Sequence, residues 1–401
     1  MRGLVASLIL GLFGAASAHA AEPPRDAEIQ RMMAHEGIPG LQAAVVKDGR
    51  VLWVKSYGSA VLDVPGPARA MSDDMMLFTA SIAKLIVTIS VFQQLEQGHL
   101  ALDDDIDRYV PFVIRHPKWP DVPITWRMLL SHTAGFAEEP DERVNRFSFF
   151  GVDPDISLEA FTEGTFTRGG VYFWEGLFTA SKPGTERIYS NYAYMLMGYA
   201  VARMTHQSFD RYAQEHVLDP LKMKHSSYWV AGHTPAQFGV GYTPLREKNG
   251  RYRFVPAFEK QAAPGHAGPI LGAQLTCPDY PDGCMRSTAS DFARLLLMIM
   301  GGGALEGAKV LEPGSVKQMI TPTGFRNHDG WTQGLGIMGP EDLRGRQVWG
   351  HDGQEHGAST AMFFNPKTGV GAVAFANAMD AGWTLNYVLD DLDLHLMAAF
   401  E

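Results

Sequence analysis

Sequence signals for β-strands occur only near the two ends of this chain. Five segments carry them, at residues 41–46, 51–56, 347–350, 359–364 and 370–376. Turn-forming sequences at 47–50 and 365–369 separate neighbouring segments and are typical of hairpins. Because short turns join antiparallel strands, the pattern predicts antiparallel pairs at each end of the chain.

Elsewhere the apolar residues mostly follow the period of an α-helix. This spacing predicts helices over 26–36, 81–97, 192–204, 209–217, 290–300 and 384–399. Glycines at 98 and 301–303 follow two of these helices, in keeping with helix C-termini. Two long stretches, 137–182 and 231–283, are rich in Gly, Pro and aromatic residues and show neither period. Stretches of this length more often form the rim of a cleft than an inert connection.

These elements predict an α+β fold in which one antiparallel sheet is built from both chain ends. We expect a sheet lobe over about 25–70 and 285–401, flanked by the terminal helices, and a mostly helical lobe over about 71–284, with a cleft between them. The chain has 401 residues, 46% of them hydrophobic, which is enough for a substantial core. Residues 21–401 are expected to form a single domain.

The first twenty residues have the pattern of a secretory signal peptide. Arg2 is followed by an apolar stretch over residues 4–13 and by a small-x-small sequence at 18–20, which predicts cleavage after Ala20. An uncleaved anchor is the alternative. No later segment has the roughly 18 uninterrupted apolar residues of a membrane span. We therefore expect a secreted or periplasmic protein without a stable membrane span.

Charge and cysteine content narrow the possible partners. The formal net charge is −10, and Lys and Arg are scattered, so nucleic acid is not an expected partner. Cys277 and Cys284 are the two cysteines of the chain and flank a turn-rich sequence. In an oxidising compartment, two nearby cysteines with none left over are expected to pair as a disulfide. A metal site would need more ligands, and a redox pair would usually read C-x-x-C.

The sequence Ser81-Ile82-Ala83-Lys84 begins the strongly apolar helix that covers 81–97. Serine is a favoured N-cap residue, which alone explains many serines in this position. Backbone N–H groups at a helix start also favour developing negative charge, and Lys84 lies one turn further on the same face. A lysine in an apolar helical turn is desolvated, which lowers its pKa and makes it a base. The alternative is a surface lysine beside a capping serine.

A second motif, Tyr189-Ser190-Asn191, lies between a loop sequence and a predicted helix. Tyr189 can donate or accept a proton, and Asn191 carries amide donors and an acceptor. Beside an ammonium group, Tyr189 is expected to carry part of its charge as phenolate and to be a second candidate base. Taken alone, the pattern is better explained by a packed tyrosine followed by an Asn cap.

The third motif, His351-Asp352-Gly353, follows the predicted strand 347–350. Gly353 allows close approach of backbone, and the N–H groups of Gln354 and Ser81 are predicted to form an oxyanion hole. A metal site of His351 and His356, with Asp352 or Glu355, is the competing interpretation. The turn expected between these residues fits no zinc spacing, so neither a metal nor another cofactor is expected. No G-x-S-x-G sequence occurs, which argues against an α/β-hydrolase.

The three motifs, in this order, resemble the serine β-lactamase and penicillin-binding protein superfamily, with the closest similarity to its class C branch, which includes D-alanyl carboxypeptidases, D-aminopeptidases and esterases. Other segments also match patterns of this family, at residues 124–135 (ITWRMLLSHTAG), 183–198, 220–223 and 285–295. The resemblance implies a β-lactamase-like fold and an acyl-enzyme mechanism. It assigns Ser81 as nucleophile, Lys84 and Tyr189 as the groups that move protons, and Asn191 as the residue that orients the acyl portion.

His351 is the main departure from the β-lactamase pattern, because many β-lactamases carry lysine at this position. Only roughly a quarter of histidines with an unperturbed pKa of about 6.5 are charged at pH 7, so recognition of a substrate carboxylate is weakened. The sequence therefore predicts a serine hydrolase for a small ester, an amide or a D-amino-acid peptide. A β-lactamase proper, or a sensor that binds β-lactams or peptidoglycan without turnover, is the alternative.

Overall fold

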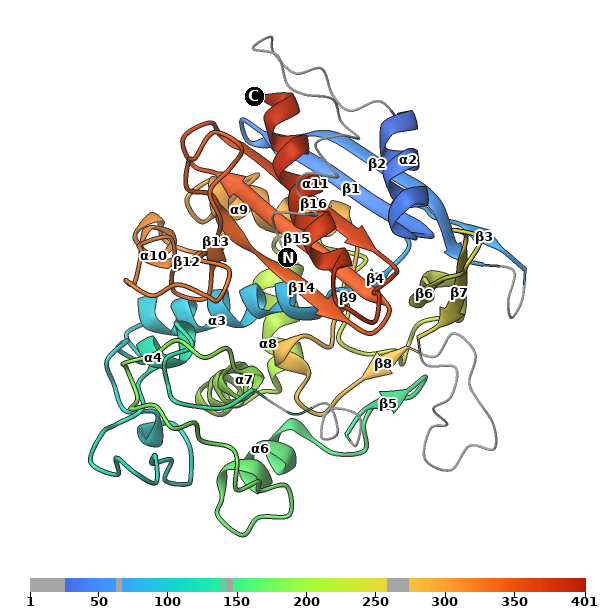
Figure 1. Ribbon diagram of the computed structural model, residues 1–401. Helices are drawn as coiled ribbons and strands as arrows, with labels where there is room; N and C mark the ends of the chain where they lie inside the picture. The colour runs from blue at the N-terminus through green and yellow to red at the C-terminus, as the bar shows by residue number, and fades with distance from the viewer. Residues whose placement is uncertain (1–25, 63–66, 139, 141–146, 258–273) are drawn as a thin grey trace.

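The computed structural model describes residues 26–62, 67–138, 140, 147–257 and 274–401. The proposed signal peptide lies outside these residues. At the centre is an eight-stranded antiparallel sheet in the order β12-β13-β14-β15-β16-β1-β2-β3 (Figure 1). Its strands are β1 (Gly40–Lys47), β2 (Arg50–Val61), β3 (Arg69–Ala70), β12 (Thr332–Gln333), β13 (Met338–Gly339), β14 (Trp349–Glu355), β15 (Ala358–Asn365) and β16 (Val370–Ala376).

The prediction of one sheet from both chain ends is confirmed by the pairing of β1 with β16. Their register runs from Leu41 opposite Ala376 to Lys47 opposite Val370. Because side chains alternate across a strand, β1 contributes to two apolar clusters. Leu41 and Val45 pack on one side of the sheet, and Ala44 and Val46 belong to the cluster on the other side. Burial on both faces explains why β1 is apolar along most of its length.

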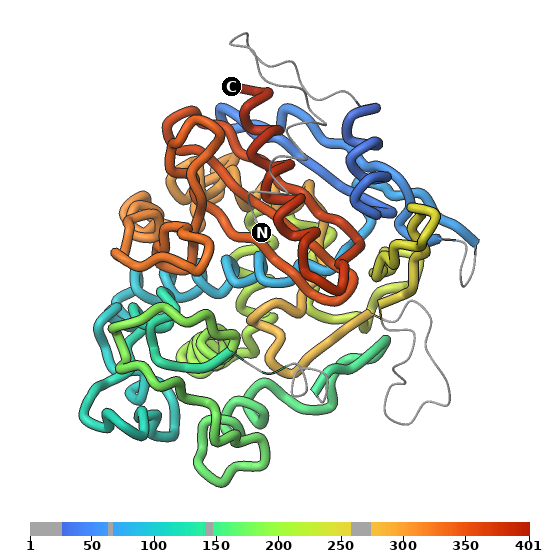
Figure 2. Tube along the Cα trace, viewed as in Figure 1, coloured from blue at the N-terminus to red at the C-terminus, as the bar shows by residue number. Residues whose placement is uncertain are grey.

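Helices cover both faces of the sheet. The first helix, α2 (Asp26–Glu36), and the last, α11 (Leu385–Phe400), pack on one face, where their apolar residues share a cluster with β1 and β16. The opposite face is covered by α9 (Ala289–Met300), which contacts β1, β15 and β16. The tube view shows the same three layers, with the two ends of the chain brought together in the sheet (Figure 2).

The remaining helices form a second region beside the β14 side of the sheet (Figure 1). They are α3 (Lys84–Glu96), α4 (Trp126–Leu130), α6 (Leu158–Phe166), α7 (Asn191–Thr205), α8 (Phe209–Ala213), the π-helical turn Gln214–Leu218 that continues α8, and α10 (Pro313–Met319). Short 3₁₀ turns lie at Ala80–Ala83, Ile106–Arg108, Pro235–Gln237 and Tyr280–Asp282. The predicted helical middle of the chain thus corresponds to this region.

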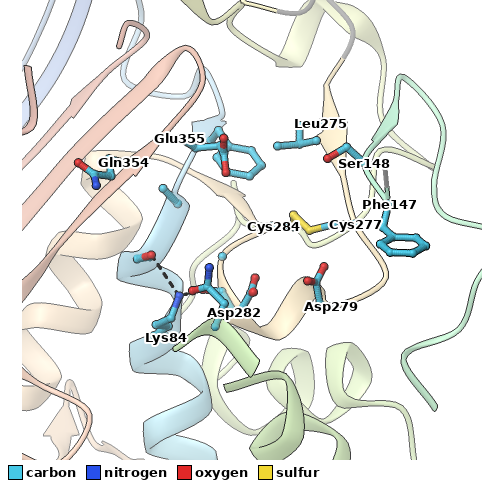
Figure 3. Close-up of a pocket in the computed structure, with 15 residues that line it drawn as sticks. Lys84, Phe147, Ser148, Leu275, Cys277, Asp279, Asp282, Cys284, Gln354 and Glu355 are labelled. Atoms are coloured by element: carbon cyan, nitrogen blue, oxygen red, sulfur yellow. Dashed lines mark hydrogen bonds between the residues drawn. A yellow bond between two sulfur atoms is a disulfide. The ribbon is translucent and has the colours of Figure 1, made fainter. Parts of the chain in front are cut away.

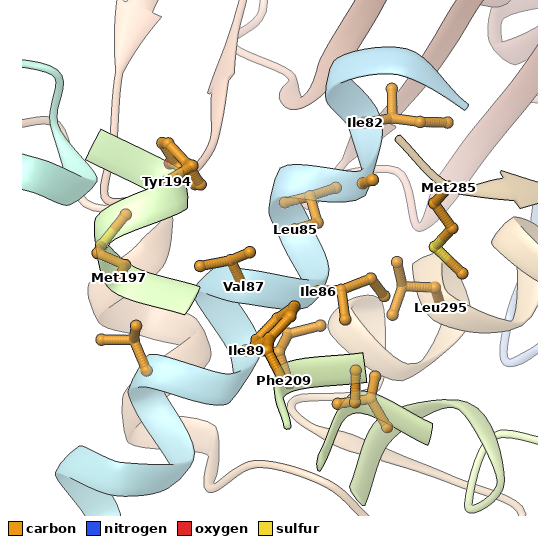
Figure 4. Packing of buried hydrophobic residues seen from close by; sticks show 14 of the residues in the cluster. Ile82, Leu85, Ile86, Val87, Ile89, Tyr194, Met197, Phe209, Met285 and Leu295 are labelled. Carbon is orange, nitrogen blue, oxygen red and sulfur yellow. The ribbon is translucent and has the colours of Figure 1, made fainter. Parts of the chain in front are cut away.

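Helix α3 lies in the middle of this region and is buried on all sides. Leu85, Ile86 and Ile89 are fully buried and belong to the main apolar cluster. Figure 4 shows them between Tyr194 of α7, Phe209 of α8 and Leu295 of α9. A helix that is apolar around its circumference is an interior helix, and each fully buried Leu or Ile contributes about 1.5–3 kcal/mol. This packing gives the turn immediately before α3 a rigid support.

Four short strand pairs lie outside the sheet. They are β4 (Leu77–Phe78) with β9 (Arg286–Ser287), β5 (Phe149–Phe150) with β8 (Leu275–Thr276), β6 (Tyr242–Arg246) with β7 (Tyr252–Pro256), and β10 (Ala304–Leu305) with β11 (Ala308–Lys309). The β5–β8 pair joins the two stretches that were expected to be irregular. The expectation was incomplete, because these stretches also contain α6 and the β6–β7 hairpin.

Strand β14 extends further than predicted. The polar, Gly-containing sequence after Gly350 was expected to turn, but β14 continues to Glu355 and pairs with β15 along its whole length. The predicted turn between His351 and His356 is therefore wrong.

Among the described helices, none combines the length and the apolar character that a membrane crossing requires.

Candidate active site

Ser81 lies in a tight 3₁₀ turn, Ala80–Ala83, that leads directly into α3. Ser81 lies at the start of the helical segment, and its alternative role as an N-cap is not seen, because Thr79 is the N-cap of the turn and Ala83 is the N-cap of α3. Ala80 has a φ of +48°, in the left-handed region that β-carbon-bearing residues avoid. Such strain persists only where the surrounding structure enforces it, and it is concentrated at functional sites.

The first two sequence motifs meet at the side chain of Ser81. The Tyr189 hydroxyl donates a hydrogen bond to Ser81 Oγ at 2.8 Å, and Lys84 Nζ donates to the same oxygen at 3.1 Å. Lys84 Nζ also donates to the backbone carbonyl of Asp282, which fixes the ammonium group from the opposite side (Figure 3). One serine hydroxyl thus contacts both groups that were predicted to exchange protons with it.

Lys84 is buried, and burial lowers its pKa to about 8. The negative charges of Asp282, Asp279, Glu138 and Glu355 act in the opposite direction and hold this pKa up. A lysine with a pKa near 8 has a substantial neutral fraction close to neutral pH, as a general base requires. The expected desolvation of Lys84 is therefore present in the structure.

Tyr189 is a neutral phenol, contrary to the expectation of a partial phenolate. Desolvation of the half-buried ring raises its pKa well above the usual value, although the hydrogen bond with Ser81 lowers it in part. The Lys84 ammonium lies 5.1 Å from the centre of the tyrosine ring, but desolvation of the phenolate is the larger effect. Lys84 is then the better base, and Tyr189 the better proton donor.

His132 packs against the ring of Tyr189. Its ring is stacked on that of Tyr189, with centroids 4.4 Å apart, and its Nδ1 accepts a hydrogen bond from the Ser190 N–H at 3.1 Å. The His132 carbonyl accepts from the Ile188 N–H at 2.8 Å. Burial holds the pKa of His132 well below its usual value, so the imidazole is neutral and Nδ1 is free to accept. The sequence analysis included His132 in a family pattern but gave it no role.

His351 is buried and neutral, and thus carries even less charge than the minor charged fraction of an unperturbed histidine. Burial, with a further contribution from Lys84, lowers its pKa to about 3. Its Nδ1–H donates to the Asp352 carbonyl at 2.5 Å. His351 and Tyr189 approach one another, with ring centroids 6.4 Å apart. The permanent positive charge near the site comes instead from Arg187, whose guanidinium lies 5.8 Å from the centre of the Tyr189 ring.

Strand β14 forms the wall opposite Ser81. A β-carbon placed on Gly353 would lie 2.9 Å from Ser81 N and 2.9 Å from the Thr79 carbonyl oxygen, so a side chain here would push the strand away. β14 pairs with β13 only at Gly350. Among the described residues, the outer edge of β14 beyond this point has no strand partner. Gln354 therefore lies on an open edge next to the Ser81 turn, in keeping with the predicted oxyanion hole.

Two cavities meet at Ser81. The smaller, of about 80 Å³, is lined by Lys84, Leu275, the cysteine pair, Asp279 and Asp282, among others (Figure 3). The larger, of about 620 Å³, is lined by Arg187, Tyr189, His356, Trp383, Asn386 and Tyr387, among others. Ser81, Asn191, Gln354 and Glu355 line both cavities. The Oδ1 atom of Asn191 is buried and accepts no hydrogen bond from the described part of the protein.

Cys277 and Cys284 are joined by a disulfide in the wall of the smaller cavity. In the described ranges, Cys277, Asp279 and Asp282 form the one group whose ligand atoms, all within 4.8 Å of one another, have metal-site spacing. The Cys277 sulfur is already bonded to Cys284 and is not a thiolate ligand. His351 and His356 do not come together, since His351 lies near Tyr189 while the His356 ring packs against Trp383 in a tilted arrangement, with ring centroids 5.2 Å apart.

Several residues of the site were not predicted as functional. They are His132, Glu138, Arg187, Asp279, Asp282, Glu355, Trp383 and Asn386. Arg187 and His132 lie within quoted family segments, so that their motif neighbours were a usable signal. No sequence signal pointed to Asn386 of α11. It lines the larger cavity and donates a hydrogen bond to Asp352 Oδ2 at 2.6 Å.

Comparisons with known proteins agree with this geometry. The curated relatives include Protein flp of Staphylococcus aureus (strain MW2), 24% identical over 340 residues that cover 85% of this chain and 60% of that protein. D-alanyl-D-alanine-carboxypeptidase/endopeptidase AmpH of Escherichia coli (strain K12) is 29% identical over 240 residues, which cover 57% of each chain. The chain thus spans about 60% of the length of these relatives.

Solved structures show the same fold at low sequence identity. D-amino acid amidase from Ochrobactrum anthropi SV3 superposes with a TM-score of 0.66 at 19% identity, covering 99% of this chain and 98% of that one. EstCE1, a hydrolase with promiscuous acyltransferase activity, gives a TM-score of 0.67 at 19% identity and covers 100% and 99%. The family model described as Beta-lactamase matches residues 25–392. The chain, with its antiparallel sheet and helical region, therefore belongs to the beta-lactamase family.

Proposed function

We propose that this protein is an exported active-site serine hydrolase that cleaves a small ester, an amide or a D-amino-acid peptide through a covalent acyl-enzyme. The observation that carries the proposal is the position of Ser81 Oγ, which lies 2.8 Å from the Tyr189 hydroxyl and 3.1 Å from Lys84 Nζ. A nucleophile within hydrogen-bond distance of a base and of a proton donor is the arrangement that acyl transfer needs.

In the acylation step, neutral Lys84 accepts the proton of Ser81 while Ser81 Oγ bonds to the substrate carbonyl carbon. The carbonyl π electrons move to the oxygen, which the N–H groups of Ser81 and Gln354 stabilise. When the bond to the leaving group breaks, Tyr189 donates its proton to the leaving atom and regains one from the Lys84 ammonium. Asn191 donates to the acyl portion and orients it.

In the deacylation step, a water molecule replaces the leaving group. Neutral Lys84 removes a proton from the water as the water oxygen attacks the acyl carbon. Collapse of the second tetrahedral intermediate releases the acid, and the proton returns to Ser81 Oγ. No acidic deacylation base analogous to the glutamate of class A enzymes is needed in this scheme.

The neutral state of His351 favours hydrolases of uncharged substrates over a β-lactamase proper. A lysine at this position would present a permanent cation to the carboxylate of a β-lactam, whereas His351 is buried with a pKa of about 3. Arg187 offers a positive charge in the larger cavity, so slow β-lactam hydrolysis is the second candidate. A sensor without turnover would acylate Ser81 and stop.

Export is part of the proposal. The signal-like first twenty residues and the Cys277–Cys284 disulfide both support an oxidising compartment. Expression of the full chain with its leader, followed by N-terminal sequencing of the mature protein, is expected to find Ala21 as the first residue. A mature protein that retains Met1 and stays with the cytosol contradicts this part of the proposal.

The activity is tested with p-nitrophenyl acetate, a chromogenic cephalosporin and a D-Ala-D-Ala peptide, each with wild type, Ser81→Ala and Tyr189→Phe. We expect steady-state ester or peptide hydrolysis that Ser81→Ala abolishes and that Tyr189→Phe lowers by about 10²–10⁴-fold in kcat, as loss of a proton donor does. A stoichiometric burst without turnover identifies a sensor. Near-wild-type activity of Ser81→Ala contradicts the assignment of the nucleophile.

A further inference from the structure

The two cavities that Ser81 lines differ about eightfold in volume, at about 80 and about 620 Å³. By this measure a water molecule needs about 10–15 Å³, so that the smaller cavity holds roughly five to eight groups of that size. The larger cavity holds many more. A substrate bound at Ser81 extends into both, and its two parts therefore face different size limits.

The position of Tyr189 decides which part of the substrate enters which cavity. Tyr189 lines the larger cavity and is not among the residues that line the smaller one. In the proposed mechanism its proton goes to the leaving atom, which must lie within hydrogen-bond distance of the phenol. The leaving group therefore occupies the larger cavity. The acyl substituent, attached to the same carbonyl carbon, extends to the other side of Ser81.

The walls of the smaller cavity limit the acyl group further. Leu275 points into the cavity in Figure 3, and its side chain is held by the pairing of β8 with β5. The Cys277–Cys284 disulfide closes the wall beside it. Asp279, Asp282 and Glu355 bring negative charge to the same walls. A carboxylate on the acyl group would meet repulsion from these side chains.

The walls of the larger cavity suit a flat or aromatic group. Trp383 and Tyr387 of the α11 region lie there, and the His356 ring packs against Trp383 at a tilt, with ring centroids 5.2 Å apart. Aromatic side chains offer stacking surface to a ring in the ligand. The Arg187 guanidinium adds a cation to this wall.

We propose, on the basis of the hydrolase function above, that the substrates carry a short acyl group without negative charge and a larger leaving group that is aromatic or otherwise flat. The small cavity at Leu275 and the disulfide takes the acyl group. The large cavity at Tyr189 and Trp383 takes the leaving group. The enzyme then selects strongly by the length and charge of the acid it releases, and weakly by the bulk of the alcohol or amine.

The first test varies one part of the ester at a time. With p-nitrophenol constant, we expect kcat/KM to fall at least 30-fold from butanoate to decanoate, and at least tenfold from butanoate to the hemisuccinate. With acetyl constant, 2-naphthyl acetate is expected to equal or exceed phenyl acetate, which has a leaving group of nearly the same acidity. Decanoate within threefold of butanoate, or hemisuccinate equal to butanoate, overturns the inference.

The second test uses matched variants of the two cavities. Leu275→Ala is expected to raise the decanoate-to-butanoate ratio at least fivefold and to leave the naphthyl-to-phenyl ratio within twofold. Trp383→Ala is expected to lower the naphthyl-to-phenyl ratio and to leave the chain-length ratio within twofold. Phe147→Ala, at the rim of the smaller cavity, replaces Leu275→Ala if that variant does not fold. The opposite pattern of ratios overturns the assignment of the cavities.

Failure of this inference is distinct from failure of the proposed function. If wild type hydrolyses both chain lengths equally and Ser81→Ala abolishes both activities, the hydrolase function stands and the size selection is wrong. If wild type hydrolyses no ester or amide, the proposed function itself is wrong.

Discussion

The Tyr189 hydroxyl donates to Ser81 Oγ at 2.8 Å, although 108 residues separate them in sequence. The contact joins the start of α7 to the turn before α3, two segments anchored in the same apolar cluster. Because a buried phenol does not ionise readily, this contact positions a proton donor rather than a base. The pH dependence of the enzyme should then report on Lys84 alone.

We expect kcat/KM for p-nitrophenyl acetate to rise through a single ionisation with a midpoint near pH 8. Lys84 must be deprotonated to accept the Ser81 proton, and its pKa is lowered by burial to about 8, so activity increases as pH rises through this value. His351 and His132 remain neutral above pH 5 and contribute no step there. A pH–rate profile from 5 to 10 checks this. A second ionisation near pH 6.5 in the kcat/KM profile, absent from His351→Asn, would contradict this prediction.

Asp279→Asn is expected to move this ionisation to lower pH. The carboxylate of Asp279 stabilises the charged form of Lys84, and its removal therefore lowers the pKa of the lysine further. The midpoint of the kcat/KM profile is the quantity to compare, since Asp279 also lines the acyl cavity. The control is Asp121→Asn, an exposed aspartate whose replacement should leave the midpoint unchanged. An upward shift in Asp279→Asn is the opposing result.

The two contacts of His132 can be tested separately with two variants. His132→Asn keeps an acceptor for the Ser190 N–H and tolerates the φ of +58°, but loses the ring stacked on Tyr189. His132→Phe keeps a ring and leaves a buried N–H unpaired, which costs about 1–3 kcal/mol of stability.

We expect His132→Asn to lower kcat by about tenfold with KM and the melting temperature little changed, because the phenol loses its support. His132→Phe should lower the melting temperature instead. Steady-state kinetics and thermal unfolding of both variants are the measurements. Unchanged kcat in His132→Asn would show that the stacked ring does not position Tyr189.

Gly353→Ala is expected to lower kcat/KM by at least about 10²-fold. Its β-carbon would lie 2.3 Å from Thr360 Oγ1 and 2.9 Å from Ser81 N, so β14 must move away from the turn and the two oxyanion donors separate. Gly314→Ala in α10 is the matched control, since no heavy atom lies within 4 Å of its new β-carbon. Kinetics with melting curves separate loss of activity from loss of folding. Wild-type kcat/KM in Gly353→Ala would exclude this role of the glycine.

The elements with a clear period were predictable from the sequence. Helix 26–36 has the predicted bounds, and β1, β2, β15 and β16 lie within two residues of them at most ends. Helix α6 was not predicted because Thr162, Gly164 and Thr165 are weak helix formers, although Ser157 is a favourable N-cap residue. The β6–β7 hairpin was missed despite Asn249-Gly250, a strong turn signal, because Pro244 weakened the strand pattern.

The convergence of the candidate site residues was predictable from the sequence, whereas their electrostatics was not. Ser81, Lys84, Tyr189, Asn191, Gly353 and Gln354 converge as expected. The protonation of Tyr189 and His351 depends on how deeply each ring is buried by segments remote in sequence, and no local pattern encodes that burial. Asn386 and Trp383 reach the site only because α11 packs on the sheet.

The pairing of β1 with β16 has a consequence for how the molecule acquires its activity. These neighbours are more than 300 residues apart, and such non-local contacts form slowly because a long loop must close first. β14, which faces Ser81, joins the sheet through β15 and β16. Ser81, the proposed nucleophile, therefore meets the strand opposite it only after nearly the whole chain has been synthesised. A nascent or truncated chain therefore lacks a complete site. We expect the enzyme to become active only when its last strands have been synthesised.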